Sequence, residues 1–245
     1  MPDSLFGSDS DSDGSYEDEP PIQPIAHVVA AASSSPPPIP GLYLFRGALP
    51  VELQHQLTEA LSEDVWQNQT NQVMLFDSPT RTSLPPYLQP LLDLLPSILA
   101  PLPEAVIDDV FSTARPRQAI LNLYFPGQGI SPHVDLPTRY SDGIVGISLL
   151  GSTVMDFLPA SALPGRPGSG YSLRLRPGDV YVLSGEARWE WTHGIAYREE
   201  DWVQDERGEV VRVRRGIRMS ITLRRMLEGA ELVGGDEEVA APATV

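Results

Sequence analysis

Three side chains in the second half of the chain are of types that bind a divalent metal ion through nitrogen and oxygen. His133 and Asp135 lie two residues apart in SPHVDLP, directly after the turn-rich run FPGQG. In an extended segment both side chains point to one face, about 7 Å apart along the strand. We expect the third ligand to be His193 in RWEWTHGI, because His27 lies in a low-complexity arm and His55 on the polar side of an expected helix.

Two histidines and one carboxylate on one side of an ion leave three coordination positions open. Non-haem Fe(II) enzymes use this arrangement, and a co-substrate and oxygen take the open positions. Zinc hydrolases can also use two histidines and a carboxylate, so a zinc site remains an alternative. The chain has no cysteine, which excludes thiolate ligands and disulfides.

Two arginines near the end of the apolar part of the chain are expected to bind anions beside the metal. In RMSITLR, residues 218–224, Arg218 and Arg224 share a face with a serine and a threonine, while the apolar residues between them face the core. Arginines on the inner face of an apolar strand are unfavourable unless they are paired. We therefore expect Arg218 to bind a carboxylate as a fork and Arg224 to pair with Asp135 or with a carboxylate near the metal.

The same alternation is found in ILNLYF, residues 120–125. The leucines and Phe125 are expected on one face, and Asn122 and Tyr124 on the other, where they offer an amide and a phenol to an oxyanion. The segment leads directly into the turn that precedes His133.

Short β-strands are expected to position these side chains. Six segments are rich in β-branched and large apolar residues and are separated by the turns PGQG, LPGRPGSG and RPGD: QAILNLYF, GIVGISLL, TVMDFL, YSLRL, DVYVLS and IRMSITLR. We place His193 at the far end of the DVYVLS strand. The spacing favours an antiparallel sandwich or jelly roll with helices packed outside one sheet.

Helices are expected ahead of the strands. Residues 50–63 carry an apolar stripe behind a proline suited to a first helical turn. Residues 84–103 alternate leucines with prolines, so we expect only short helical turns there, about residues 87–95.

Composition divides the chain into a central domain and two acidic tails. We predict a disordered Ser/Pro-rich arm at 1–40, a folded domain at 41–226 and a disordered tail at 227–245. The formal net charge is −16, but twelve of the 33 acidic residues lie in 1–40 and 226–245, which leaves 21 acidic residues against 17 arginines in the middle. A nucleic-acid partner therefore stays open, and the acidic arm is a candidate site for a protein partner.

The chain shows no sign of membrane insertion or secretion. No apolar run approaches the roughly 20 residues that a membrane helix needs. The acidic N-terminus lacks the basic and apolar regions of a secretory signal. We expect a soluble protein of the cytoplasm, the nucleus or both.

The segments NLYFPGQGISPHVD, VMDF, LSGEARWEWTHGI and RRGIRMSITLRR resemble, in this order and spacing, the AlkB-type Fe(II)/2-oxoglutarate dioxygenases. The likeness covers about residues 118–226. It is greatest to eukaryotic members, especially the oxygenase module of the tRNA wobble-uridine hydroxylase. It implies a mainly β fold with flanking helices, the double-stranded β-helix (jelly roll) of 2-oxoglutarate oxygenases.

The resemblance also implies a set of catalytic and co-substrate residues. Fe(II) would be bound by His133, Asp135 and His193. 2-Oxoglutarate would be bound by Asn122, Tyr124, Arg218 and Arg224. Arg218 would bind the distal carboxylate and Arg224 the metal-proximal end. With O₂, such enzymes release succinate and CO₂ and hydroxylate a substrate C–H bond, and a hydroxylated N-methyl group leaves as formaldehyde.

The function implied is hydroxylation or oxidative demethylation of a modified or alkylated base, in RNA such as tRNA ahead of DNA. DNA-repair members carry an acidic residue shortly after the His-x-Asp pair, where this chain has Leu136-Pro137, and this argues against repair of methylated adenine or cytosine. The tRNA-modifying members also carry an RNA-binding module and a methyltransferase, for which 245 residues leave no room. We therefore expect either that such partners are separate chains or that the substrate is different.

Two alternatives stay open. The same chemistry could act on a protein side chain or a small molecule, and the chain could instead be a non-catalytic interaction module. For a nucleic-acid substrate, we expect Trp189, Trp191 and Tyr140 to stack on a base at the mouth of the site, and Arg139 and Arg188 to contact phosphate.

Overall fold

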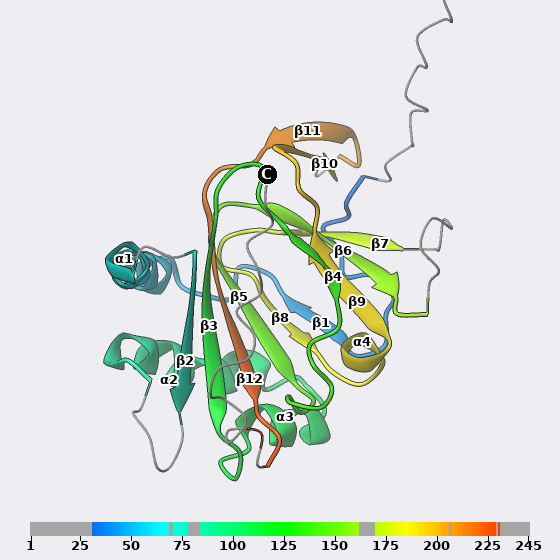
Figure 1. Ribbon diagram of the computed structural model, residues 1–245. Coiled ribbons are helices and arrows are strands. Elements are labelled where there is room, and N and C mark those ends of the chain that lie inside the picture. Colours follow the sequence, from blue (N-terminus) through cyan, green and yellow to red (C-terminus); the bar gives the residue numbers. More distant parts are fainter. Residues whose placement is uncertain are drawn as a thin grey trace, which may run out of the picture.

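Two antiparallel sheets face each other, and three helices cover the outer face of the larger one (Figure 1). The computed structural model describes residues 31–68, 71–77, 84–161, 170–205, 207–228 and 230, and the side chains of these residues except those of 64–68. The predicted jelly roll with helices outside one sheet is confirmed.

The larger sheet has six strands in the order β1-β8-β5-β12-β3-β2. In that order they are β1 (Leu42–Phe45), β8 (Val180–Leu183), β5 (Ile144–Leu150), β12 (Arg218–Arg225), β3 (Arg117–Tyr124) and β2 (Gln72–Asp77). Strands β12 and β3 pair along their whole lengths, from Arg218 opposite Tyr124 to Arg225 opposite Arg117. This register places the polar positions of both strands on one face.

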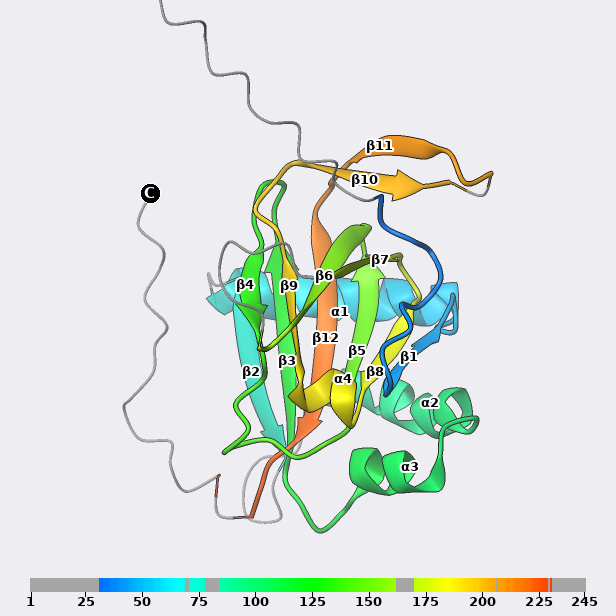
Figure 2. The ribbon, with the colours of Figure 1, turned by 90° about the vertical axis from the view of Figure 1, so that its right-hand side faces the viewer.

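The smaller sheet has four strands in the order β4-β9-β6-β7, and a two-stranded hairpin, β10-β11, lies beside it (Figure 2). These strands are β4 (Ile130–His133), β9 (Trp191–Ile195), β6 (Thr153–Pro159), β7 (Tyr171–Leu175), β10 (Glu200–Gln204) and β11 (Val210–Arg214). Apolar side chains of both sheets meet in one cluster, which includes Ile144 and Leu183 from the larger sheet and Phe157 and Leu173 from the smaller one.

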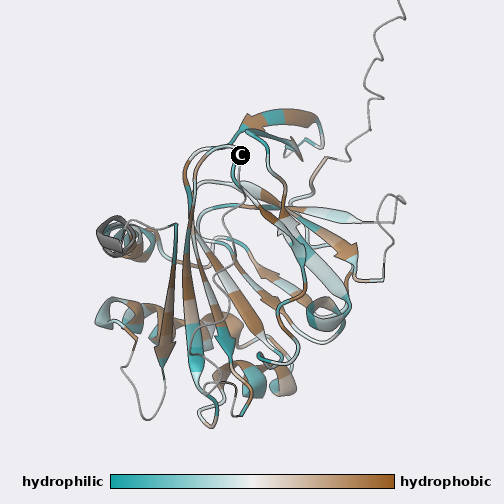
Figure 3. Ribbon diagram, in the orientation of Figure 1, coloured by the Kyte–Doolittle hydropathy of each residue, from teal (hydrophilic) through white to brown (hydrophobic). Residues whose placement is uncertain are grey.

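The main core lies between the helices and the larger sheet. The helices are α1 (Val51–Asn68), α2 (Gln89–Leu99, preceded by the 3₁₀ turn Pro86–Leu88) and α3 (Glu104–Phe111). Their buried leucines and valines pack against the apolar face of β3, β5, β8 and β12. Apolar residues are spread along these strands in Figure 3, and hydrophilic segments mark the lower ends of β3 and β12.

Helix α2 is longer than the predicted short turns. It continues through Pro96, which lacks the N–H of a helical hydrogen bond. Leu91, Leu95 and Leu99 recur every four residues and are all buried, so burial of this stripe outweighs the missing hydrogen bond. The predicted helix over 50–63 is confirmed as α1. Sequence patterns did not predict α3, β1 or β2.

His193 lies in β9 and not, as expected, at the far end of the DVYVLS strand. The short helix α4 (Glu186–Trp189) follows β8 and leads the chain from the larger sheet to the smaller one. The expectation was wrong because no pattern in the sequence indicated that the chain passes from one sheet to the other between DVYVLS and His193.

Contacts with the fold begin ahead of residue 41, the predicted start of the domain. Ala32 forms a parallel bridge with Val203, Ser33 forms one with Leu173, and Ile39 is buried between the sheets. The predicted arm before residue 31 and the predicted tail from 231 lie outside the described residues. Within the described part of the chain, no helix is long and apolar enough to cross a membrane.

Candidate active site

The histidines and the aspartate singled out in the sequence come together between the two sheets. One candidate ligand atom from each of His133, Asp135 and His193 lies within 4.8 Å of the other two. His133 Nε2 is 3.8 Å from Asp135 Oδ1, and the two imidazole centroids are 4.5 Å apart. Three donors at these separations could hold one metal ion on a single side.

Neighbouring strands of the smaller sheet bring the two imidazoles together. His133 ends β4 and lies opposite His193 of β9 in the antiparallel register. A Cβ atom at Gly194 would lie 2.8 Å from the backbone nitrogen of Pro132, so glycine lets β4 approach closely here. Asp135 follows two residues after β4, in a loop that returns toward the larger sheet.

Each imidazole can turn one ring nitrogen toward an ion. His133 Nδ1 is 2.9 Å from the carbonyl oxygen of Ser131. Because a carbonyl oxygen only accepts, Nδ1 carries a proton and Nε2 is the nitrogen that faces the ion. Burial lowers the pKa of His193 to about 4, although Asp135 opposes the shift. His193 is therefore neutral at pH 7, the form that binds metals.

Arg224 holds one oxygen of the Asp135 carboxylate and leaves the other free. Arg224 Nη1 donates to Asp135 Oδ1 at 2.7 Å, and its Nε donates to Gln118 Oε1 at 2.7 Å. The guanidinium lies over the Tyr140 ring, 3.4 Å from the centroid. Among the described residues, Asp135 Oδ2 is buried and has no hydrogen-bond partner. The predicted Arg224–Asp135 pair is confirmed, and Oδ2 is available to an ion.

Arg218 is a buried cation that contacts two serine hydroxyls. Its Nη1 donates to Ser220 Oγ at 2.6 Å and its Nη2 to Ser148 Oγ at 3.5 Å. Within the described residues it forms no ion pair, and its Nε has no partner. Burial lowers the pKa of Arg218, while Tyr181 and Tyr124 oppose the shift. A buried unpaired guanidinium is costly, so this position favours an anion.

One cavity of about 410 Å³ joins these groups. Its lining includes all seven residues singled out in the sequence: Asn122, Tyr124, His133, Asp135, His193, Arg218 and Arg224. Asn122 Oδ1 also accepts a hydrogen bond from Gln72 Nε2 of β2 at 2.8 Å. Phe125, expected on the apolar face, lies beyond the end of β3 and is exposed.

Tyr181 lines the same cavity and was missed by sequence reasoning. It lies opposite Gly146 in the β5–β8 register, and a Cβ atom on that glycine would be 2.0 Å from the tyrosine ring. Burial raises the pKa of Tyr181 to about 12, although Arg218 opposes the shift. The hydroxyl therefore stays protonated and can donate to an anion held by Arg218. Two sequence features could have indicated this residue: the alternation within DVYVLS, which sets Tyr181 on a different face from its valine neighbours, and the glycine of GIVGIS, which leaves space for a large ring.

Several side chains expected at the mouth of the site lie elsewhere. Arg188 is 2% exposed and donates to the backbone carbonyls of Asp135, Tyr140 and Ser141 at 2.9, 3.1 and 3.3 Å. Its predicted contact with phosphate is wrong, because α4 directs it inward to hold the loop that carries Asp135. Arg139 is half-buried beside Tyr140.

The predicted stacking surface is not found. Trp189 and Trp191 line a separate hollow next to α4, where Trp191 Nε1 donates to Glu186 Oε1 at 3.0 Å. Tyr140 is buried beneath Arg224 and forms part of the cavity wall. None of the three aromatic residues offers an open face at the mouth.

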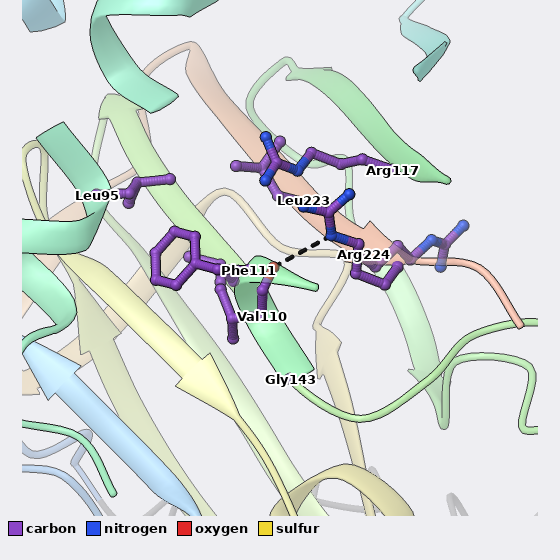
Figure 4. Close-up of a pocket in the computed structure, with 9 residues that line it drawn as sticks. Leu95, Val110, Phe111, Arg117, Gly143, Leu223 and Arg224 are labelled. Carbon is purple, nitrogen blue, oxygen red and sulfur yellow. Dashed lines mark hydrogen bonds between the residues drawn. The ribbon is translucent and has the colours of Figure 1, made fainter. Parts of the chain in front are cut away.

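A narrow gap on the helix side of β12 is a packing region. Figure 4 shows its lining, where Leu95 and Phe111 lie near Leu223. Arg225 Nε donates to the carbonyl of Val110 at 3.2 Å, which ties β12 to α3. Successive residues of β12 thus serve different faces: Arg225 supports the helix layer, whereas Arg224 reaches Asp135.

The groups present fit an iron ion and a dicarboxylate. Two imidazoles and a carboxylate oxygen without a partner among the described residues form the donor set that suits non-haem Fe(II). The unpaired Arg218 on the same cavity wall suits a carboxylate that also approaches the ion.

Comparison with known proteins agrees with this geometry. Residues 43–224 match the family described as the 2OG-Fe(II) oxygenase superfamily. Uncharacterized protein L905 of Acanthamoeba polyphaga mimivirus is 27% identical over 176 residues, which cover 71% of this chain and 80% of the viral protein.

A second relative is much longer than this chain. The tRNA (carboxymethyluridine(34)-5-O)-methyltransferase ALKBH8 of Macaca fascicularis is 32% identical over 149 residues, which cover 56% of this chain and 22% of that protein. This chain therefore matches about a fifth of its length. The solved structure of OsALKBH1 aligns with a TM-score of 0.50 at 15% identity, covering 76% of this chain and 98% of that one, and shares the fold.

Proposed function

The chain belongs to the 2OG-Fe(II) oxygenase superfamily as an AlkB-like 2-oxoglutarate-dependent dioxygenase, and from this premise we propose that it hydroxylates or oxidatively demethylates a modified base in nucleic acid, in RNA ahead of DNA. The observation that carries the proposal is the single cavity shared by the His-Asp-His cluster and the unpaired Arg218. We also propose, from sequence alone, that the protein acts in the cytoplasm, the nucleus or both.

Fe(II) and 2-oxoglutarate, when bound, supply the oxidising chemistry, in which O₂ converts 2-oxoglutarate to succinate and CO₂ and hydroxylates a substrate C–H bond. His133, Asp135 and His193 would hold the metal. Arg218 would bind the distal carboxylate of 2-oxoglutarate, with its serine partners orienting the guanidinium. Arg224 keeps Asp135 in place and would face the end of the co-substrate near the metal.

Asn122 and Tyr124 would complete the co-substrate site. Both project from β3 into the cavity beside Arg218, where an amide and a phenol can hydrogen-bond the carboxylate and keto oxygens.

The outer part of the cavity supports a planar, partly apolar substrate. Met74 and Leu136 line it and are 51% and 47% exposed. Apolar side chains at the mouth of a polar cavity offer a surface to the face of a nucleobase. The ALKBH8 relative is named for a tRNA nucleoside, which supports RNA over DNA as the first substrate class to test.

The test measures succinate and modified nucleosides together. Purified protein with Fe(II) and 2-oxoglutarate is given RNA from cells, matched DNA, or a peptide pool, and each product is analysed by mass spectrometry. We expect RNA to raise succinate release above the substrate-free rate, with an oxidised or demethylated nucleoside appearing in equal amount. Stimulation by peptides alone would contradict the proposal and favour a protein substrate.

Two histidine variants separate catalysis from a non-catalytic binding role. His133→Ala removes a proposed metal ligand and should abolish succinate release. His55→Ala removes an exposed histidine of α1, a helix that contributes no residue to the cavity lining, and should leave the rate unchanged. Equal succinate release by both variants would show that this cluster is not the metal site.

A further inference from the structure

Two arginines contact Ser34 where the N-terminal segment docks on the smaller sheet, and a third, Arg174, belongs to the strand beside this segment. Arg46 donates through Nε to the carbonyl of Ser34 at 2.9 Å and through Nη2 to the same oxygen. Arg176 Nη2 donates to Ser34 Oγ at 3.1 Å. Arg174 lies between them on β7, and Arg46 Nη1 donates to its carbonyl at 2.7 Å.

The backbone holds Ser34 in this position. Ser33 N donates to the carbonyl of Ser172 at 3.1 Å, and Arg174 N donates to the carbonyl of Ser33 at 2.9 Å. The segment thus forms a short parallel bridge beside β7, and Figure 2 shows it passing from β10 down to β1. Ser34 is half-buried, whereas its neighbour Ser35 is exposed.

One nearby carboxylate, Asp179, is already engaged by three donors. It accepts from Arg46 Nη1, from Gly47 N at 3.0 Å and from Arg176 N at 2.8 Å. A second, Asp201, is engaged by Arg215, whose Nε and Nη2 each lie 2.7 Å from one of its oxygens.

Positive charge is therefore left over around the Ser34 hydroxyl. The Nε atoms of Arg174 and Arg176 are buried and, among the described residues, have no hydrogen-bond partner. Burial lowers the pKa of Arg174, and repulsion from Arg176 and Arg46 lowers it further. Unpaired buried donors on crowded guanidiniums favour an added anion.

We propose that Ser34 is a phosphorylation site and that its phosphate is bound by Arg46, Arg174 and Arg176, fastening the N-terminal segment to the smaller sheet. A protein kinase would transfer the γ-phosphoryl group of ATP to Ser34 Oγ, so that an O–P bond replaces the O–H bond and ADP and a proton are released. The phosphate brings about two negative charges and three acceptor oxygens to the atom that Arg176 already contacts. The modified serine would neutralise the surplus charge of the cluster.

The test compares phosphoserine at two adjacent positions of the full chain. Phosphoserine is incorporated genetically at residue 34 or at residue 35, and each phosphate is titrated by ³¹P NMR. We expect the second pKa of the phosphate at 34 to lie about one unit or more below that at 35, because guanidiniums stabilise the dianion. We also expect slower hydrogen exchange at the amides of Ser33 and Arg174 in the first protein only.

Substitution of the arginines checks the partners. In the protein phosphorylated at 34, Arg176→Gln should raise the phosphate pKa toward the value at 35, whereas Arg212→Gln, which removes an exposed arginine of β11, should not. If Arg176→Gln does not fold, the comparison of positions 34 and 35 still decides the question.

Two outcomes would overturn the proposal. Equal phosphate pKa values and equal exchange at the two positions would show that the cluster does not bind the modified serine. Protection of the same amides in the unmodified protein by inorganic phosphate, without a pKa difference between positions 34 and 35, would assign the cluster to a free anion instead.

Discussion

Arg218 and Arg224 are six residues apart on one strand, and the structure gives them different partners. Arg224 is neutralised by Asp135, while Arg218 has two serine hydroxyls and no carboxylate within the described part of the chain. In the proposed function, Arg224 would therefore maintain the metal site, and Arg218 would keep its charge for the co-substrate. Affinity for 2-oxoglutarate should depend most on Arg218.

Arg218→Lys should weaken 2-oxoglutarate binding about 10- to 100-fold. Lysine keeps the charge but loses the fork, and hydrogen bonds to charged groups contribute about 1.5–3 kcal/mol. The dissociation constant is measured by calorimetry with Mn(II) in place of Fe(II), so that turnover does not interfere. Arg225→Lys is the matched control, since Arg225 is equally buried on the helix side of β12. It should lower thermal stability and leave the dissociation constant unchanged.

Tyr181→Phe should weaken 2-oxoglutarate binding by a smaller factor, about 2- to 10-fold. The substitution removes one neutral donor, which contributes about 0.5–1.5 kcal/mol, and keeps the ring that packs over Gly146. The same calorimetric titration measures the effect. An unchanged dissociation constant would show that the hydroxyl does not reach the co-substrate.

At the level of elements, β5, β8 and β12 form one wall of the cavity because each places its small or polar residues on the inner face. Tyr181 of β8 and Arg218 of β12 line the cavity, and Gly146 of β5 lies against the Tyr181 ring. Their apolar neighbours along each strand pack against the helices. Side-chain alternation thus lets the same three strands build the core on one face and the site on the other.

Gly146→Ala should damage the site from a position that carries no functional group. The added Cβ would lie 2.0 Å from the Tyr181 ring, so the ring must move, at a typical cost of about 1–3 kcal/mol. We expect a lower melting temperature and weaker 2-oxoglutarate binding. Gly216→Ala, where an added Cβ meets nothing within 4 Å, should change neither quantity. Equal behaviour of the two variants would contradict the proposed contact.

At the level of the whole molecule, the site exists only when both sheets are assembled. His133 and His193 come from the smaller sheet, whereas Arg218, Asn122 and Tyr124 come from the larger one. Asp135 joins the two, since it follows β4 and pairs with Arg224 of β12. Ligands that bridge these groups should therefore stabilise the packing of one sheet on the other.

Mn(II) and 2-oxoglutarate together should raise the melting temperature more than the sum of their separate effects. A ligand that binds only the folded state at 100 times its dissociation constant stabilises it by about 2.7 kcal/mol. Differential scanning calorimetry measures the shift, and a chelator should reverse it. His133→Ala should show no combined effect, because the co-substrate would lose its partner at the metal end.

The type of fold and the chemistry of the site followed from local patterns, because alternation along a strand decides which residues share a face. Parity alone assigned Arg218 and Arg224 to the polar face of one strand and Asn122 and Tyr124 to the polar face of another, and the histidines followed from their scarcity. These features depend only on residues near each other in the chain. The seven residues therefore needed no coordinates to be chosen.

Contacts between distant segments were decided by the tertiary structure. Four features join segments that are far apart in sequence. They are the inward direction of Arg188, the crossing that places His193 in β9, the contact of Tyr181 with Gly146, and the docking of Ser34 beside the arginines. Helix α2 continues through Pro96 for the same reason, since its leucines are buried by other elements. Local patterns do not decide such contacts, because their free energy arises only when the sheets and helices pack together.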